Sequence, residues 1–229
     1  MKGKDRSSQV IAIIALVVGV VALSIGFAAF STTLTIESAA DVTMTEALDV
    51  VFSTSGSTVS TGSVNGVASG VAGATADAAT LSGTTIEGIK AHFTKPGQIV
   101  TYTFNAYNNS PFTAYLKTIT FGETTSGTVT AAKVCTPNSA NDNAATQGVD
   151  AACADIQISV TVGDHTATGS ETSTNIGTHA LAAVSEASHS ETVVVTIEYL
   201  NGTGHGHTAD GDFSVAFGDI TLGYSSVAS

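Results

Sequence analysis

The sequence predicts an all-β protein, an antiparallel β-sandwich of the Ig-like or jelly-roll type, preceded by an N-terminal hydrophobic signal or anchor helix. Apolar and polar residues alternate with a period of two along most of the chain, as they do in half-buried strands. Gly, Asn and Pro separate the alternating segments, and strands do not alternate with helices in the way that builds parallel sheets. These observations predict antiparallel sheets that pack on each other.

The first element is a hydrophobic helix. Val10–Phe30 carries no charged residue and, at about 20 residues, is long enough to cross a bilayer. The basic residues that precede it should remain on the cytoplasmic side. Gly26 and Ala28 have the spacing that signal peptidase requires before its cleavage point, so cleavage is expected between Ala28 and Ala29.

Two outcomes of export remain open. Cleavage would remove residues 1–28 as a signal peptide and release the protein. Retention would keep them as a membrane-anchor helix, and the chain would then meet the membrane only through residues 10–30. Both outcomes predict an extracellular or cell-surface location for the rest of the chain.

The next element is a strand, expected at Thr32–Glu37 within an N-terminal segment formed by residues 29–40. Four residues spaced by two share one face of this segment: Phe30, Thr32, Leu34 and Ile36. The small residues at 38–40 could act as a hinge. We therefore predict a donor strand that completes the sheet of a neighbouring copy. The alternative is that this strand folds back into its own domain.

The β-sandwich domain is expected at residues 41–229. Its predicted strands are Leu48–Ser53, Thr84–Phe93, Ile99–Asn108, Ala114–Phe121, Ile156–Val162, Thr192–Leu200 and Asp212–Leu222. Hairpin-type connections are expected at Asn108–Pro111 and at Asn201-Gly202. Residues 55–79 fit a long loop, a pair of small-residue strands or a short helix at Ala74–Ala79, and residues 164–190 are similarly weak in pattern.

The net charge of the chain limits the kinds of partner that are expected. The chain has 7 Lys and Arg against 19 Asp and Glu, which gives a formal net charge of −12. The few basic residues are scattered and form no phosphate-binding patch, so nucleic acid is not an expected partner.

Cys135 and Cys153 are the only cysteines. In an exported chain such a pair most simply forms one disulfide, here closing a loop rich in Pro, Asn, Asp, Ala and Gly. A redox or metal role would favour a closer Cys-x-x-Cys spacing.

Several motifs together resemble a known family. The sequence GFAAF at residues 26–30 leads directly into a strand, and KPGQ at residues 95–98 leads into VTYTFNAYNN. This combination resembles the TasA/camelysin family of exported biofilm-matrix fibre proteins, most clearly over residues 20–40 and 94–121. The resemblance implies an extracellular fibre protein. The chain departs from the family pattern at Gln98, where the family favours Asp, and in its cysteine pair.

Catalytic motifs are missing from the sequence. It contains no Gly-x-Ser-x-Gly elbow, no phosphate-binding Gly-x-x-x-x-Gly-Lys loop and no His-Glu-x-x-His, so we do not expect an enzyme and expect no cofactor. Most of the six histidines stand alone among Ser, Thr and Gly, and each is expected to be a solvated loop or sheet-surface residue rather than a catalyst.

One weak metal site is conceivable. His205 and His207, two residues apart on an extended segment, would point to the same side, and Asp210 could complete a Zn²⁺ or Cu²⁺ site. The competing interpretation is a flexible turn. Asp142, Asp150 and Asp155 lack the Asp-x-Asp-x-Asp-Gly pattern of a Ca²⁺ loop, so they are expected to be solvated.

These observations favour a structural subunit of an extracellular fibre or pilus-like biofilm matrix, with itself as the main partner and other matrix or host-surface components as further ones. The alternative is a monomeric, membrane-tethered adhesin or binding domain that reads ligands with its loops. An exported metallopeptidase is the third and weakest possibility.

Overall fold

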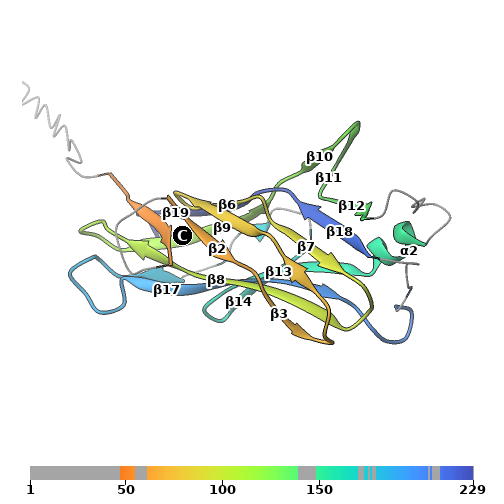
Figure 1. Cartoon of the computed structure of the whole chain (residues 1–229). Coiled ribbons are helices and arrows are strands. Elements are labelled where there is room, and N and C mark those ends of the chain that lie inside the picture. Colours follow the sequence, from red (N-terminus) through yellow and green to blue (C-terminus); the bar gives the residue numbers. More distant parts are fainter. Residues whose placement is uncertain are drawn as a thin grey trace, which may run out of the picture. The chain divides into compact units, whose positions relative to one another are not determined.

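Antiparallel strands form the framework of the protein (Figure 1). The computed structural model describes residues 47–54, 61–138, 148–169, 173–174, 176, 179–205, 207 and 212–228. The predicted signal or anchor helix, the cleavage point between Ala28 and Ala29, and the donor strand at residues 29–37 lie outside these residues. Among the helices that are described, none is long and apolar enough to span a membrane.

The first sheet contains the longest strands. Its members, in spatial order, are β1 (Val50–Ser53), β8 (Gln98–Asn108), β17 (Ser190–Tyr199), β13 (Ile156–Val162) and β14 (His165–Thr168), with β3 (Val67–Gly70) also paired to β8. Alternate residues of β8 and β17 are buried, which is the period of two that the sequence displays. The predicted strands at 48–53, 99–108, 156–162 and 192–200 are therefore confirmed within about two residues.

Two further sheets form the second layer. The four-stranded one has the order β12 (Lys133–Pro137), β18 (Phe213–Phe217), β7 (Lys90–Phe93) and β4 (Thr75–Ala76). The other has the order β15 (Ser173–Thr174), β9 (Ala114–Phe121), β19 (Ile220–Ser225), β6 (Thr85–Glu87), β5 (Ala78–Ser82) and β2 (Thr61–Asn65), with β16 (Ala180–Leu181) also on β9. A separate hairpin is formed by β10 (Thr124–Ser126) and β11 (Val129–Ala131).

The two sheets of the second layer are continuous in the chain, because β6 runs into β7 and β18 runs into β19. The strands predicted at 84–93 and 212–222 are thus each interrupted once. The first break falls at Gly88, whose φ of 70° only glycine adopts without strain. The second falls at Gly218, where a Cβ atom would lie 2.2 Å from the backbone of Gly122. Glycine at these points lets a long strand bend and change sheets.

Aromatic side chains join the first sheet to the second layer. The ring of Tyr199 on β17 lies 5.6 Å from that of Phe213 on β18 and 5.9 Å from that of Phe93 on β7. The hydroxyl of Tyr102 on β8 donates hydrogen bonds to the carbonyl oxygens of Lys90 (2.8 Å) and Asp77 (3.0 Å). All of these rings belong to one core cluster that both layers share. Residues 45–229 accordingly form one compact unit.

The connection at Asn108–Pro111 is not a hairpin, because β8 and β9 belong to different sheets. The Asn108 side chain is fully buried, and its amide nitrogen donates to the carbonyl oxygens of Phe112 (2.8 Å) and Ala182 (2.8 Å). Its Oδ1 accepts from the backbone N–H of Ser110. This buried amide builds a corner that carries the chain from one layer to the other.

The connection that includes Asn201 and Gly202 is also not a hairpin. β17 pairs with β8 and β13, whereas the next strand, β18, pairs with β12 and β7. The chain therefore crosses between the layers here. This crossing carries His205 and His207.

The described residues of the weakly patterned segments include several short strands. Of the three alternatives for residues 55–79, small-residue strands are present among the described residues, but β2 pairs with β5 and β3 with β8 rather than with each other. The helix considered at Ala74–Ala79 is not formed. A short helix that the sequence did not predict, α2 (Val149–Ala154), precedes β13.

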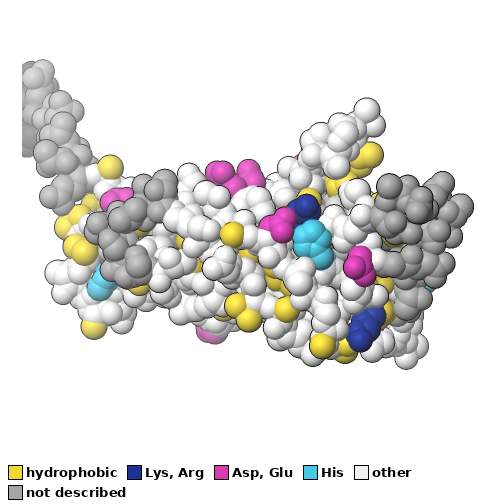
Figure 2. Space-filling view, viewed as in Figure 1, with side chains coloured by type: hydrophobic (Ala, Val, Ile, Leu, Met, Phe, Trp, Pro, Cys, Tyr) yellow, Lys and Arg dark blue, Asp and Glu magenta, His cyan; other side chains and the backbone are white. Residues whose placement is uncertain are grey.

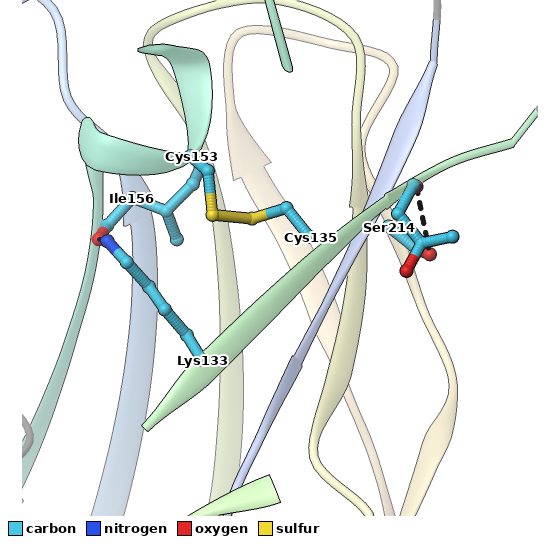
Figure 3. The surroundings of a disulfide bond; sticks show 6 residues. Lys133, Cys135, Cys153, Ile156 and Ser214 are labelled. Carbon is cyan, nitrogen blue, oxygen red and sulfur yellow. Dashed lines mark hydrogen bonds between the residues drawn. A yellow bond between two sulfur atoms is a disulfide. The ribbon is translucent and has the colours of Figure 1, made fainter. Parts of the chain in front are cut away.

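The Cys135–Cys153 disulfide is present in the structure, with the Cα atoms 6.0 Å apart (Figure 3). Cys135 lies on β12 and Cys153 on α2, so the bond ties the edge strand of the second layer to the helix that leads into β13. The disulfide therefore closes a loop and also cross-links the two layers.

We expect Cys135→Ser to lower the free energy of unfolding by about 3 kcal/mol while the sheets persist, because the cross-link closes a loop of 18 residues in the unfolded chain. Urea unfolding followed by circular dichroism measures the loss. An unchanged unfolding midpoint, or alkylation of both thiols in the unreduced, unfolded wild type, would contradict the prediction.

Candidate functional site

Asp155, between α2 and β13, is the centre of a buried polar cluster. Its side chain is 4% exposed, and each of its oxygens faces one histidine. His205 Nδ1 lies 2.9 Å from Oδ1, and His207 Nδ1 lies 2.9 Å from Oδ2. The backbone N–H of His207 donates to the same Oδ2 at 3.0 Å. The expectation that Asp155 is solvated is therefore wrong.

The two histidines point to the same side, as their spacing predicts. The carboxylate that they meet among the described residues is that of Asp155, while the predicted third ligand, Asp210, lies outside them. Because the Nδ1 atom of each ring is engaged with Asp155, this arrangement anchors the interlayer crossing to the start of β13.

Two residues near this cluster, Tyr199 and Lys133, have shifted pKa values. The Tyr199 hydroxyl donates to the carbonyl oxygen of His207. Burial, with a smaller effect of the Asp155 charge, raises the pKa of Tyr199 to about 12. Burial lowers the pKa of Lys133, and the Asp155 charge partly opposes that shift. The buried carboxylate of Asp155 is thus balanced by the nearby ammonium group of Lys133 and by its hydrogen bonds to the two histidines.

Next to this cluster lies a pocket of about 330 Å³, which we call the edge groove. Apolar side chains dominate its lining, and they come from both layers: Phe121, Ile156, Ile158, Leu200, Phe217 and Ile220. Three polar side chains share the lining: Lys133, Gln157 and His205. The edge groove is therefore an apolar recess between the layers that also contains the three polar side chains in its lining.

Part of one edge of β13 lies next to the groove without a strand partner among the described residues. β14 pairs with β13 only from Ser159 to Val162. Within the described part of the chain, no strand pairs with residues 156–158 on the side away from β17. On the opposite wall, β12 is paired on one side only, by β18, as far as the described residues show. Each layer thus presents a strand edge next to the groove.

The side chain of Lys133 binds the edge of β13 at a position where no described strand pairs with it. Its Nζ donates to the carbonyl oxygen of Ile156 across the gap between β12 and β13 (Figure 3). The backbone N–H of Gly169 donates to the carbonyl of Ile158 at 3.1 Å. A lysine at an edge is a common means of protecting unpaired backbone groups from uncontrolled association.

The other histidines are more engaged than the sequence suggests. His92 Nε2 lies 3.2 Å from Asp77 Oδ1, and His179 Nε2 is hydrogen-bonded to Glu191. His92 lies on the sheet surface, as expected, whereas His179 is only 14% exposed and the expectation is wrong for it. Glu191 is on β17 of the first sheet and reaches His179 through the packing of the layers, so sequence spacing could not predict this contact.

Figure 2 shows how sparsely charged and histidine side chains are distributed over the visible face of the protein. This fits a chain in which only 11% of residues are charged. The described part of this face displays no continuous basic area.

Comparison with models of known protein families finds no match to this chain, and a search of curated proteins finds none either.

Proposed function

We propose that this protein is the structural subunit of an extracellular fibre, and that the edge groove receives the N-terminal strand of another copy. In this proposal the two layers form a β-sandwich of the jelly-roll or Ig-like type with a structural and no catalytic role. The resemblance of residues 20–40 and 94–121 to the TasA/camelysin fibre proteins supports the same assignment.

The placement of the groove relative to the start of the domain carries this proposal. β1 begins at Val50, which pairs with Asn108, and Ser190 at the start of β17 pairs with Tyr107 at that same end. Ile156, at the groove, pairs with Tyr199 at the far end of β17. At about 3.4 Å per residue, these two ends of β17 lie about 30 Å apart. In Figure 1, β12 and α2 mark the groove end of the domain.

This separation suits head-to-tail assembly. The donor segment precedes β1 in the chain, and β1 begins at the end of the domain opposite the groove. A contact between two different surfaces of identical subunits does not close on itself unless it forms a ring, so it builds filaments.

The chemistry of the two partners also matches. The donor segment places Phe30, Leu34 and Ile36 on one face, and the lining of the groove is mainly apolar. The open edge of β13 at residues 156–158 offers backbone groups to an added strand. When that strand arrives, it would replace Lys133 as the partner of the Ile156 carbonyl.

Site-specific photo-crosslinking in fibres tests the proposal. Gln157 is exposed and lines the groove, so a photoreactive residue placed there is expected to crosslink to residues 29–37 of another copy, identified by mass spectrometry. The same residue at Val67, which is 65% exposed on β3, serves as the matched control. Fibres in which position 157 captures no N-terminal peptide would contradict the proposal.

A further inference from the structure

A second cluster of histidine and carboxylate side chains lies away from the edge groove. Asp164 Oδ1 is 3.5 Å from His165 Nε2 and 3.8 Å from His179 Nδ1. One potential ligand atom from each of the three residues lies within 4.8 Å of the other two. The exposed fractions of the side chains fall from 89% for Asp164 through 36% for His165 to 14% for His179, so the cluster is open on one side only.

The three residues come from different layers. Asp164 lies in the turn between β13 and β14 of the first sheet, and His165 is the first residue of β14. His179 immediately precedes β16, which pairs with β9 of the second layer, and its carbonyl oxygen accepts the backbone N–H of Leu116 on β9. A ligand held by all three would therefore join the layers.

Glu191 fixes the orientation of His179. Its carboxylate is hydrogen-bonded to His179 Nε2, which leaves Nδ1 as the ring nitrogen that lies 3.8 Å from Asp164 Oδ1. That distance is too long for a hydrogen bond, so both atoms remain available as ligands of a metal ion. A carboxylate on the far nitrogen is the usual support for a metal-binding histidine.

Gly163 makes room for this arrangement. A Cβ atom at this position would lie 2.8 Å from His179 Cε1 and 2.2 Å from Glu191 Oε1. The glycine also has a φ of 59°, which the tight β13–β14 turn requires. The turn can therefore bring Asp164 and His165 against the His179–Glu191 pair only with glycine at residue 163.

We propose that Asp164, His165 and His179 bind a divalent transition-metal ion of the zinc type, with Glu191 as a positioning residue and the fourth coordination position open to water. Ligands at about 2.0–2.1 Å from a tetrahedral ion lie about 3.3 Å from one another. The two separations to Asp164 need to contract only slightly to reach that value. Two imidazoles and one carboxylate favour zinc over calcium or magnesium, which prefer oxygen ligands.

The ion would be a second cross-link between the layers, in addition to the disulfide. The disulfide joins the layers just before β13 begins, through α2, and the metal would join them just after β13 ends, at Asp164. β13 is the strand whose edge lies next to the groove. The disulfide and the metal ion would therefore both stabilise the strand to which the donor strand is proposed to add. The metal proposal itself does not depend on that function.

Zinc titration of the mature, metal-stripped full chain tests the site. Calorimetry is expected to show one ion per chain. The melting temperature is expected to rise by about 5–10 °C when free zinc exceeds Kd about 100-fold. His165→Gln and His179→Gln should abolish both effects, and Glu191→Gln should weaken binding by about 10–100-fold. Cobalt in place of zinc should give the intense visible absorption of a tetrahedral site, and should lose it in His165→Gln.

The matched control is His92→Gln, which removes a histidine outside this cluster and outside the edge groove and should leave zinc affinity unchanged. His165 is partly exposed, so His165→Gln is expected to melt like wild type in chelator, which separates lost binding from misfolding. Absence of zinc binding by wild type, its survival in His165→Gln and His179→Gln, or its loss in His92→Gln would each overturn the assignment.

Discussion

Mature chains that carry Leu34→Asp are expected to remain folded monomers under conditions in which the unchanged chain forms fibres. Leu34 is central on the apolar face of the proposed donor strand, and the groove walls that would receive it include Ile156, Ile158 and Phe217. Burying an unpaired carboxylate there costs several kcal/mol. A penalty of about 4 kcal/mol corresponds to a roughly thousandfold weaker contact at every junction of a filament.

Electron microscopy and light scattering measure this effect. The matched control is Thr35→Asp, which adds the same charge to the opposite face of the same strand and should still permit fibres. Circular dichroism should show the same strand content in both variants, because residues 29–37 precede the compact unit at 45–229. Fibres that persist with Leu34→Asp, or polymerisation of a chain that starts at Asp41, would show that this strand is not the donor.

Local alternation was sufficient to predict strands that lie wholly within one sheet. Ile99–Asn108 and Ile156–Val162 correspond to β8 and β13 because every second residue faces the shared core. Where a strand changes sheets, alternation continues through the break, so the interruptions at Gly88 and Gly218 were not visible in it. Connections were harder still, because the Asn108 corner depends on carbonyl groups more than 70 residues away in the chain.

Gln98 shows how one buried side chain can satisfy the backbone groups of a turn. Its side chain is fully buried, and its Oε1 accepts the backbone N–H groups of Thr94 (2.7 Å) and Lys95 (3.1 Å). Its amide nitrogen donates to the carbonyl oxygen of Ala72 at 2.9 Å. An aspartate would lack that donor, so glutamine is the residue that satisfies this turn together with its neighbouring strand connection.

The candidate sites were only partly predictable for a similar reason. The spacing of His205 and His207 correctly placed them on one side, but their partner, Asp155, is 50 residues away and reaches them through the α2–β13 junction. The Asp164–His165–His179 cluster combines a hairpin turn with a segment of the other layer. Residue spacing describes neighbours along a strand, whereas these clusters are created by the packing of layers.

The free energy of unfolding is expected to fall steeply as the pH rises from about 10 to 12. Burial raises the pKa of Tyr102 to about 12, and burial also raises the pKa of Tyr199 to about 12. In the unfolded chain both hydroxyls ionise near pH 10. Between these values the unfolded state releases protons that the folded state retains, so stability is full below pH 10 and is lost above it.

The size of this effect follows from the shifts. Two pKa units correspond to about 3 kcal/mol for each tyrosine, so the pair would remove on the order of 5 kcal/mol, a large part of the stability of an ordinary domain. Urea unfolding at a series of pH values measures the slope, and tyrosinate absorbance reports the ionisation itself. Burial raises the pKa of Tyr224 as well, so Tyr102→Phe removes one of three such groups and should lower the slope by about a third. A free energy that stays flat up to pH 12 would mean that these two hydroxyls, which lie between the layers, can ionise without separating them.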